Sequence, residues 1–159
     1  MTPQTLRAVM ETHGDAVYRL ALCRLQNTAD AEDVCQEVFL RLYRQDCAAW
    51  DDEHLKAWLL RTAVNRCADV GRFRLRRSAL PLESITETAA PEDERAEALW
   101  AAVGSLPVKF RTVVHLHYAE GYSTNEIAAM LRIPPATVRT RLRRGREKLK
   151  TILGGDEDE

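Results

Sequence analysis

The apolar residues of this chain recur at helical spacing along almost its whole length. Residues three or four positions apart lie on one face of a helix. This spacing predicts helices over residues 4–13, 15–26, 30–44, 53–77, 92–103, 107–120, 123–131 and 135–153. Gly14 separates the first two, so we expect a break there. No segment alternates apolar and polar residues as a strand does, and the chain is therefore predicted to be all-α.

The pattern stops at residues 78–91, which read SALPLESITETAAP. This segment contains two prolines, two serines and two threonines and has no apolar stripe, which is typical of a linker. We therefore expect two small helical domains, residues 1–77 and 92–154, joined by a flexible linker and followed by an acidic tail at 155–159.

The polar residues of the second domain predict a helix-turn-helix. Ser123 and Glu126 have the spacing of a capping box, which starts a helix. Residues 132–134 make a brief turn before the last helix. That helix has one apolar stripe, formed by Val138, Leu142, Leu149 and Leu153. A short capped helix, a tight turn and a longer helix with a polar outer face are the parts of this DNA-binding motif.

The distribution of charge strengthens this interpretation. The net charge of -1 conceals a basic segment, residues 106–154, with ten basic and three acidic side chains. The last helix alone carries seven cations against Glu147; they are Arg139, Arg141, Arg143, Arg144, Arg146, Lys148 and Lys150. A solvated face usually mixes signs, and arginine suits bidentate contact with guanine or phosphate. The second domain is therefore predicted to bind DNA.

Two faces of the first domain allow more than one functional interpretation. One face of the segment 30–44 carries acids and amides, which suit either solvent or a docked protein better than DNA phosphate. The segment 53–77 carries Asn65, Arg66, Asp69 and Arg72 towards its basic end. Asparagine and aspartate can hydrogen-bond base edges while arginine holds the backbone. A second nucleic-acid contact is therefore a hypothesis for this segment.

Other chemistry finds little support in the sequence. The four cysteines, Cys23, Cys35, Cys47 and Cys67, form no CxxC pair, so we interpret them as small, partly buried thiols, with a redox-sensitive Cys47 as the alternative. No nucleophile–base pair, phosphate loop or metal-ligand motif is found, so we expect no enzyme activity, cofactor or metal. No apolar run approaches the ~18 residues of a membrane-spanning helix, and a cytoplasmic protein is expected.

Three blocks of the sequence resemble the extracytoplasmic-function (ECF) sigma factors, members of the sigma-70 family of bacterial RNA polymerase. The blocks are DAEDVCQEVFLRLYR, HLKAWLLRTAVNRCADVGRFRLRR and LPVKFRTVVHLHYAEGYSTNEIAAMLRIPPATVRTRLRRGREKLK. They follow one another in the family's order and separation, and together they cover nearly the whole chain. The resemblance implies that residues 1–77 correspond to sigma region 2 and residues 92–154 to sigma region 4.

The resemblance also implies a role for particular residues. The first block would dock on the clamp helices of the largest subunit of core RNA polymerase through Asp33, Gln36, Glu37 and Tyr43. The second would melt and recognise the -10 promoter element through Asn65, Arg66, Asp69 and Arg72, with residues 45–54 shaping the pocket for a flipped base. The third would place its last helix in the major groove of the -35 element through Thr137, Arg139, Arg143 and Arg144. An inhibitory anti-sigma partner is expected as well.

Two features depart from the family pattern. Arg132 stands in the turn where the family often has glycine, so a left-handed backbone there would cost about 1 kcal/mol. The acidic tail is expected to aid solubility, and autoinhibition of the basic helix is a weaker hypothesis. Two rival functions stay open at this point. One is a dimeric helix-turn-helix regulator that acts without joining polymerase, and the other is a metal or redox sensor that uses the cysteines.

Overall fold

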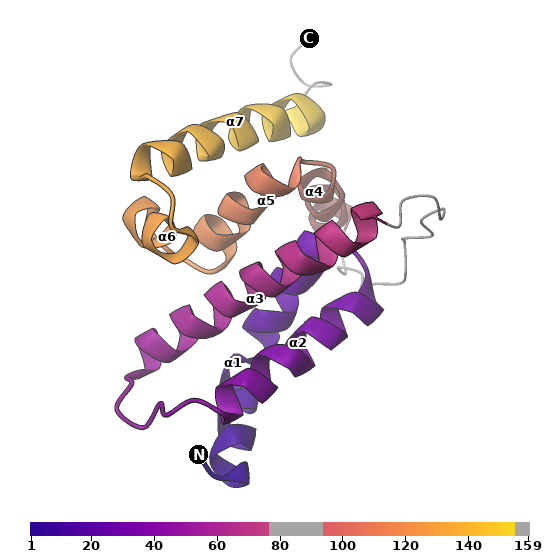
Figure 1. Ribbon diagram of the computed structural model, residues 1–159. Coiled ribbons are helices and arrows are strands. Elements are labelled where there is room, and N and C mark those ends of the chain that lie inside the picture. The colour runs from indigo at the N-terminus through magenta and orange to yellow at the C-terminus, as the bar shows by residue number, and fades with distance from the viewer. Residues whose placement is uncertain (77–93, 155–159) are drawn as a thin grey trace. The chain divides into compact units, whose positions relative to one another are not determined.

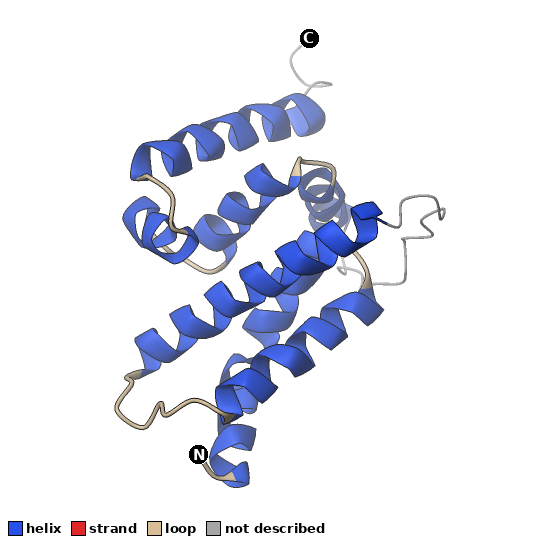
Figure 2. Ribbon diagram, in the orientation of Figure 1, coloured by secondary structure: helices blue, strands red, loops and turns tan. Residues whose placement is uncertain are grey.

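The structure is a computed structural model that describes residues 1–76 and 94–154. Helices and the loops that join them make up the described part of the chain, which contains no strand, as the sequence predicts (Figure 2). The chain divides into two compact units, Met1–Thr86 and Glu87–Glu159. The expected linker and acidic tail lie outside the described residues. None of the described helices is both long and apolar enough to cross a membrane.

The first unit is a bundle of three helices, α1 (Pro3–Leu25), α2 (Thr28–Tyr43) and α3 (Asp52–Arg76), each of which packs against the other two (Figure 1). Its core is formed by aliphatic side chains from all three helices. These include Val17, Leu20 and Ala21 of α1, Val34, Val38 and Leu42 of α2, and Leu59, Leu60 and Ala63 of α3. The bundle therefore sets the outer faces of α2 and α3 at fixed positions.

Helix α1 runs without a break, so the interruption expected at Gly14 is wrong. A glycine inside a helix costs about 1 kcal/mol relative to alanine. His13 precedes Gly14, and Val17 and Leu20 follow it. The burial of these three side chains outweighs that cost. His13 is 5% exposed, and its Nε2 lies 2.9 Å from Oδ1 of Asp52, the first residue of α3. This contact ties the start of α3 to the middle of α1.

The second unit contains α4 (Glu94–Gly104), α5 (Val108–Val114), a π-helical turn η1 (His115–Ala119), α6 (Thr124–Leu131) and α7 (Pro135–Gly154). Its core includes Leu106, Phe110, Val113, Leu116 and Ile127. Helices α4, α5 and α6 all pack against α7, and α6 and α7 form the expected helix-turn-helix (Figure 1).

The predicted turn chemistry of this motif is confirmed. The Ser123 hydroxyl accepts from the backbone N–H of Glu126, and the Glu126 carboxylate accepts from the backbone N–H of Ser123. Arg132 ends α6 in the left-handed region at φ 61°, where its N–H bonds the carbonyl of Ala128. Both ends of the short helix α6 are thus set by local hydrogen bonds.

Candidate nucleic-acid and protein interfaces

The last helix is seated on α5 by a close backbone approach. Val138, Leu142 and Gly145 of α7 are buried. A Cβ atom added at Gly145 would lie 2.9 Å from Cγ2 of Val114, closer than carbon atoms pack. Because only glycine fits there, the α7 backbone packs directly on the side chains of Val114 and Phe110 of α5. This contact fixes which face of α7 points to solvent.

That outer face of α7 is strongly cationic. Six cations are exposed, and Arg141 is half-buried; the exposed ones are Arg139, Arg143, Arg144, Arg146, Lys148 and Lys150. Nη1 of Arg143 lies 3.7 Å from Oε2 of Glu147, an exposed i,i+4 pair that contributes little to stability. The sequence of α7 contains no other acid. The helix therefore presents a positive surface that suits a polyanion.

The four residues assigned to the -35 element lie on two flanks of this helix. Thr137 and Arg144 are one heptad apart and share one flank, and Arg139 and Arg143 share the other. A groove of about 480 Å³ brings Arg139 and Arg143 together and does not include Thr137 or Arg144. Thr137 is half-buried, whereas the three arginines are exposed. The structure thus separates the predicted set into two pairs.

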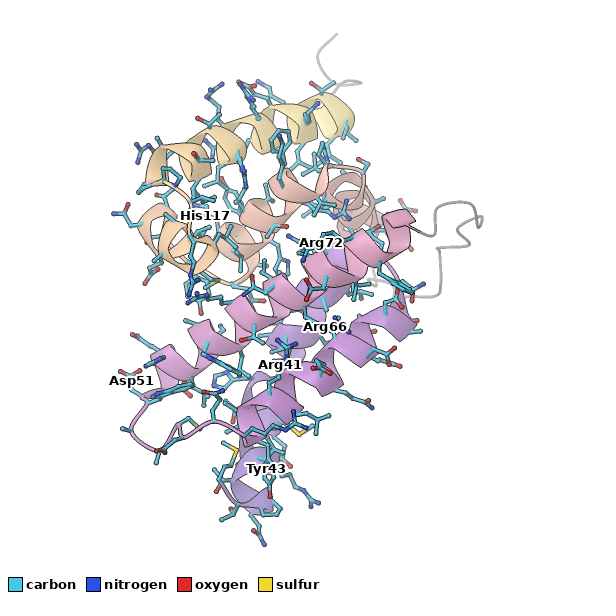
Figure 3. The ribbon with its side chains drawn as sticks, viewed as in Figure 1. Arg41, Tyr43, Asp51, Arg66, Arg72 and His117 are labelled. Carbon is cyan, nitrogen blue, oxygen red and sulfur yellow. The ribbon has the colours of Figure 1, made fainter. Side chains whose placement is uncertain are left out.

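The same groove contains residues that the sequence analysis did not assign to the -35 element, among them His117, Thr124, Thr140 and Arg146. His117 donates through Nδ1 to the carbonyl of Tyr122 at 2.7 Å (Figure 3). Arg146 donates to the Tyr118 hydroxyl at 3.2 Å. Helical spacing placed His117 on the apolar face of the segment 107–120 and gave no binding role to it or to Tyr118. The sequence could have indicated Thr124, because it directly follows the cap residue Ser123.

A buried contact between His115 and Glu120 spans the π-helical turn η1. Nε2 of His115 lies 3.3 Å from Oε2 of Glu120, and the two side chains are 8% and 1% exposed. The backbone N–H of Glu120 also bonds the carbonyl of His115 at 3.2 Å. A buried carboxylate is costly unless it is paired. The pair therefore holds the ends of the turn together and sets where α6 begins.

Helix α2 carries an exposed stripe on the side away from the core. Asp33, Gln36 and Tyr43 are exposed and Glu37 is half-buried, so all four residues assigned to polymerase docking lie on the surface. Gln36 and Glu37 follow Asp33 by three and four residues, and Tyr43 follows Gln36 by seven, which places all four on one face. Glu37 accepts from Nε of Arg41 at 3.1 Å, which orients its carboxylate along the helix (Figure 3).

The stripe includes a residue that sequence reasoning missed. Leu40 lies on the same face and is 52% exposed, and it lines a groove together with Met10 of α1, which is 45% exposed. This open groove has a volume of about 840 Å³ and also reaches Leu6 and Tyr43. Exposed apolar side chains grouped in this way are typical of a protein-binding surface. The sequence could have indicated this residue, because the helical repeat places Leu40 on the outer face of the helix.

The residues assigned to the -10 element come from α3. Asp69 pairs with two arginines: its carboxylate accepts from Nη2 of Arg72, and it lies 3.8 Å from Nη1 of Arg66. Arg66, Asp69 and Arg72 line one groove beside α2. Asn65 is exposed and lies outside that groove. The structure thus brings three of the four residues together and leaves Asn65 apart.

Aromatic side chains gather where the α2–α3 loop enters α3. The rings of Trp50 and His54 stack at 4.4 Å with an angle of 12° between their planes, and Trp58 lies 5.8 Å from Trp50. The Asp51 carboxylate accepts from the backbone N–H of His54 at 2.7 Å and so starts the helix. Trp50 and His54 fall within the loop that the sequence analysis assigned to the base pocket. Their stacking was not foreseen.

Two of the four cysteines are held as unreactive thiols. All four are free, Cys23 and Cys67 are buried, and Cys35 and Cys47 are half-buried. Burial raises the pKa of Cys35 to about 11 and that of Cys67 to about 12. Both thiols are therefore protonated at neutral pH, whereas the thiolate is the nucleophile and metal ligand. Within residues 1–76 and 94–154, no group of three or more His, Cys, Asp or Glu side chains is arranged to hold a metal ion.

Comparison with protein families gives two matches along the chain. Residues 9–79 match Sigma-70 region 2, and residues 96–149 match Sigma-70, region 4. Helices α2 and α3 fall within the first match, and the helix-turn-helix falls within the second.

Several curated proteins are similar over most of this chain. The ECF RNA polymerase sigma factor SigE of Mycolicibacterium smegmatis is 39% identical over 155 residues, which cover 91% of this chain and 60% of SigE. SigW of Bacillus subtilis, also an ECF RNA polymerase sigma factor, is 30% identical over 164 residues, which cover 91% of this chain and 87% of SigW. The chain thus spans less than two thirds of the first protein and most of the second.

Solved structures show the same fold. CnrH, solved in complex with the cytosolic domain of CnrY, matches with a TM-score of 0.68 and 26% identity, over 99% of this chain and 92% of CnrH. The sigma factor RpoE of Bartonella quintana, solved with the anti-sigma factor NepR, matches with a TM-score of 0.76 and 23% identity, over 95% of each chain.

Proposed function

This chain belongs to the ECF sigma factors of the sigma-70 family, and we propose that its two domains divide promoter recognition by RNA polymerase between them. Residues 1–77 act as region 2, which docks on core polymerase and opens the -10 element. Residues 92–154 act as region 4, which binds the -35 element. The chain supplies specificity, and the polymerase supplies catalysis.

Docking uses the exposed stripe of α2. Asp33 and Glu37 offer negative charge towards one end of this face, and Leu40 and Tyr43 offer apolar surface towards the other. A partner helix with basic residues beside apolar ones fits such a face, because charge fixes its register and apolar burial provides affinity. The clamp helices of the polymerase's largest subunit are the partner we propose for it.

The -10 site uses α3 and the loop before it. Taking a base out of the stack costs a few kcal/mol, so a pocket must recover that energy. Aromatic rings recover about 1–3 kcal/mol per stacked base. Trp50 and His54 supply such rings at the loop, and Asn65 supplies an exposed amide for a base edge. Arg66 and Arg72 supply charge for the backbone of the opened strand.

The -35 site uses α7. Arg139, Arg143 and Arg144 reach the major groove from both flanks of the helix, and the half-buried Thr137 lies near its N-terminal end. The groove with Thr124 and Arg146 suits a backbone phosphate beside the base contacts. Base contacts then give sequence specificity, and phosphate contacts set the register.

One observation carries this proposal. A single chain combines an acidic and apolar face on one helical domain with a cationic recognition helix on the other. A dimeric helix-turn-helix regulator explains the second domain and leaves the first without a role. The match of residues 9–79 to Sigma-70 region 2 supplies that role.

A protein partner and a cellular location follow from the same proposal. CnrH was solved with the cytosolic domain of CnrY, which supports a protein partner for this chain too, and the partner we propose is an inhibitory anti-sigma factor. Such a partner binds the chain and abolishes its core-dependent transcription. Since RNA polymerase acts in the cytoplasm, the sigma factor is active there.

Reconstitution with bacterial core RNA polymerase tests the proposal. Run-off transcription from a genomic promoter library should yield transcripts whose start sites share one pair of -35 and -10 elements. Core enzyme alone is the control and should yield none of them. Binding to duplex DNA without association with core would favour the dimeric regulator instead.

A further inference from the structure

A groove of about 620 Å³ lies between α2 and α3 in the first domain. Its charged lining comes from both helices: Asp30 and Asp33 from α2, and Arg66, Asp69 and Arg72 from α3, where Figure 3 labels both arginines. Asp33 also belongs to the proposed docking stripe, and the α3 residues belong to the proposed -10 site. The two proposed surfaces therefore share the walls of this groove.

Asp69 holds the two arginines of the groove. Its carboxylate bonds Arg72 and lies 3.8 Å from Arg66. The three side chains are between 36% and 60% exposed, so water reaches the pairs and an incoming anion can replace the carboxylate at low cost. Arginine binds phosphate oxygens in the same way as it binds a carboxylate. Both guanidinium groups are thus already directed at the place where a phosphate would bind.

The charge of the groove opposes that exchange in the free chain. Three carboxylates, those of Asp30, Asp33 and Asp69, face two guanidinium groups, which leaves a net charge of -1. A like charge about 4 Å away in water weakens the binding of an anion about fivefold. A phosphate must therefore overcome Asp30 and Asp33 and also displace Asp69.

We propose that this groove binds a backbone phosphate of the -10 strand between Arg66 and Arg72, and that Asp33 weakens this binding until the chain docks on polymerase. Docking pairs Asp33 with a cation of the partner and removes its repulsion. The phosphate then replaces Asp69 beside the arginines. This inference rests on the proposed docking and -10 roles of α2 and α3.

Binding of the free full-length chain to a fluorescein-labelled single-stranded oligonucleotide tests the effect of Asp33. Asp33→Asn should bind about fivefold more tightly than the wild type at low salt. Asp15→Asn is the matched control, because Asp15 is an exposed carboxylate of α1 outside the groove. Adding Arg66→Ala and Arg72→Ala to Asp33→Asn should remove the gain. Equal affinities for Asp33→Asn and Asp15→Asn, or a gain that survives loss of both arginines, would overturn the inference.

The assembled holoenzyme tests the phosphate itself. Loss of both arginines should reduce the dependence of promoter affinity on salt, with a slope smaller by about 1 for the lost contact. An unchanged slope would overturn the phosphate site. Failure of the wild-type holoenzyme to initiate would instead overturn the proposed function, so the two failures are distinguishable.

Discussion

Gly145 and Val114 are in such close contact that no side chain fits between them. A Cβ atom at position 145 would lie 2.9 Å from Cγ2 of Val114 and 3.6 Å from Cβ of Phe110. Valine is stiff at its only rotatable bond, so the strain passes to the backbones of α5 and α7. This glycine therefore determines how closely the recognition helix packs on the domain that supports it.

We expect Gly145→Ala to destabilise the second domain. Overpacking a core costs about 1–3 kcal/mol, which exceeds the ~1 kcal/mol that alanine gains over glycine in a helix. Urea unfolding followed by circular dichroism measures the change. Gly14→Ala is the control: its Cβ meets no atom within 4 Å, so it should stabilise the first domain. If Gly145→Ala instead stabilised the second domain, the packing of α5 on α7 would have to adjust to the added methyl group without cost.

Arg132→Gly should stabilise the helix-turn-helix by about 0.5–1 kcal/mol. Arg132 has φ 61°, a conformation that costs about 1–2 kcal/mol for residues other than glycine. Glycine removes this cost, although its greater freedom in the unfolded chain offsets part of the gain. The opposite change, Gly121→Ala, should destabilise the domain, because Gly121 has φ 80°. Thermal unfolding of both variants checks the two signs together.

Glu37→Lys should weaken association with core polymerase by about tenfold or more, because it reverses the charge in the middle of the docking stripe. Leu40→Ala should also weaken association, since it removes exposed apolar surface from the same face. Affinity for labelled core enzyme gives both values. Glu97→Lys makes the same charge change on an exposed position of the second domain and should leave association unaltered.

Arg144→Ala should weaken binding to a -35 duplex by about 1–3 kcal/mol and relax specificity at one base pair if the side chain contacts a base. Electrophoretic mobility assays on a set of single-substitution duplexes resolve this. An equal, small loss on every sequence would make Arg144 a phosphate contact. Lys150→Ala, about two turns further along α7, provides the comparison for a cation near the end of the helix.

Trp50→Ala should slow promoter opening. The stacked pair of Trp50 and His54 is the proposed platform for the flipped base, and loss of one stack costs about 1–3 kcal/mol. Transcription from duplex templates should therefore fall, while a template with a pre-opened -10 region should recover most of the activity. An equal defect on both templates would show that Trp50 supports the stability of the domain and does not stack on the flipped base.

The sequence predicted the features that depend on neighbouring residues. The capping box of Ser123 and Glu126 involves groups within a few positions of each other, so residue types and spacing suffice. The all-α fold followed in the same way from the helical spacing of apolar side chains.

Features that depend on distant residues escaped prediction. Gly14 does not break α1, because its neighbours are buried against α2 and α3, which local propensity ignores. The contact of His13 with Asp52 joins positions 39 residues apart. For Arg66, Asp69 and Arg72, the sequence predicted only that they lie near one another. Which of their charges pair depends on side-chain rotamers.

That contact between His13 and Asp52 has a consequence for how the family can diversify. The loop between α2 and α3 is anchored at its first end, where the N–H of Arg44 bonds the carbonyl of Arg41, and at its second end by Asp52 on His13. Residues 45–50 can then change in identity without loosening the three-helix core, because neither anchor lies within them and Asp51, whose carboxylate starts α3, lies just outside them. Under the proposed -10 role of this segment, evolution or an engineer can exchange it to retarget a promoter preference while the scaffold stays constant.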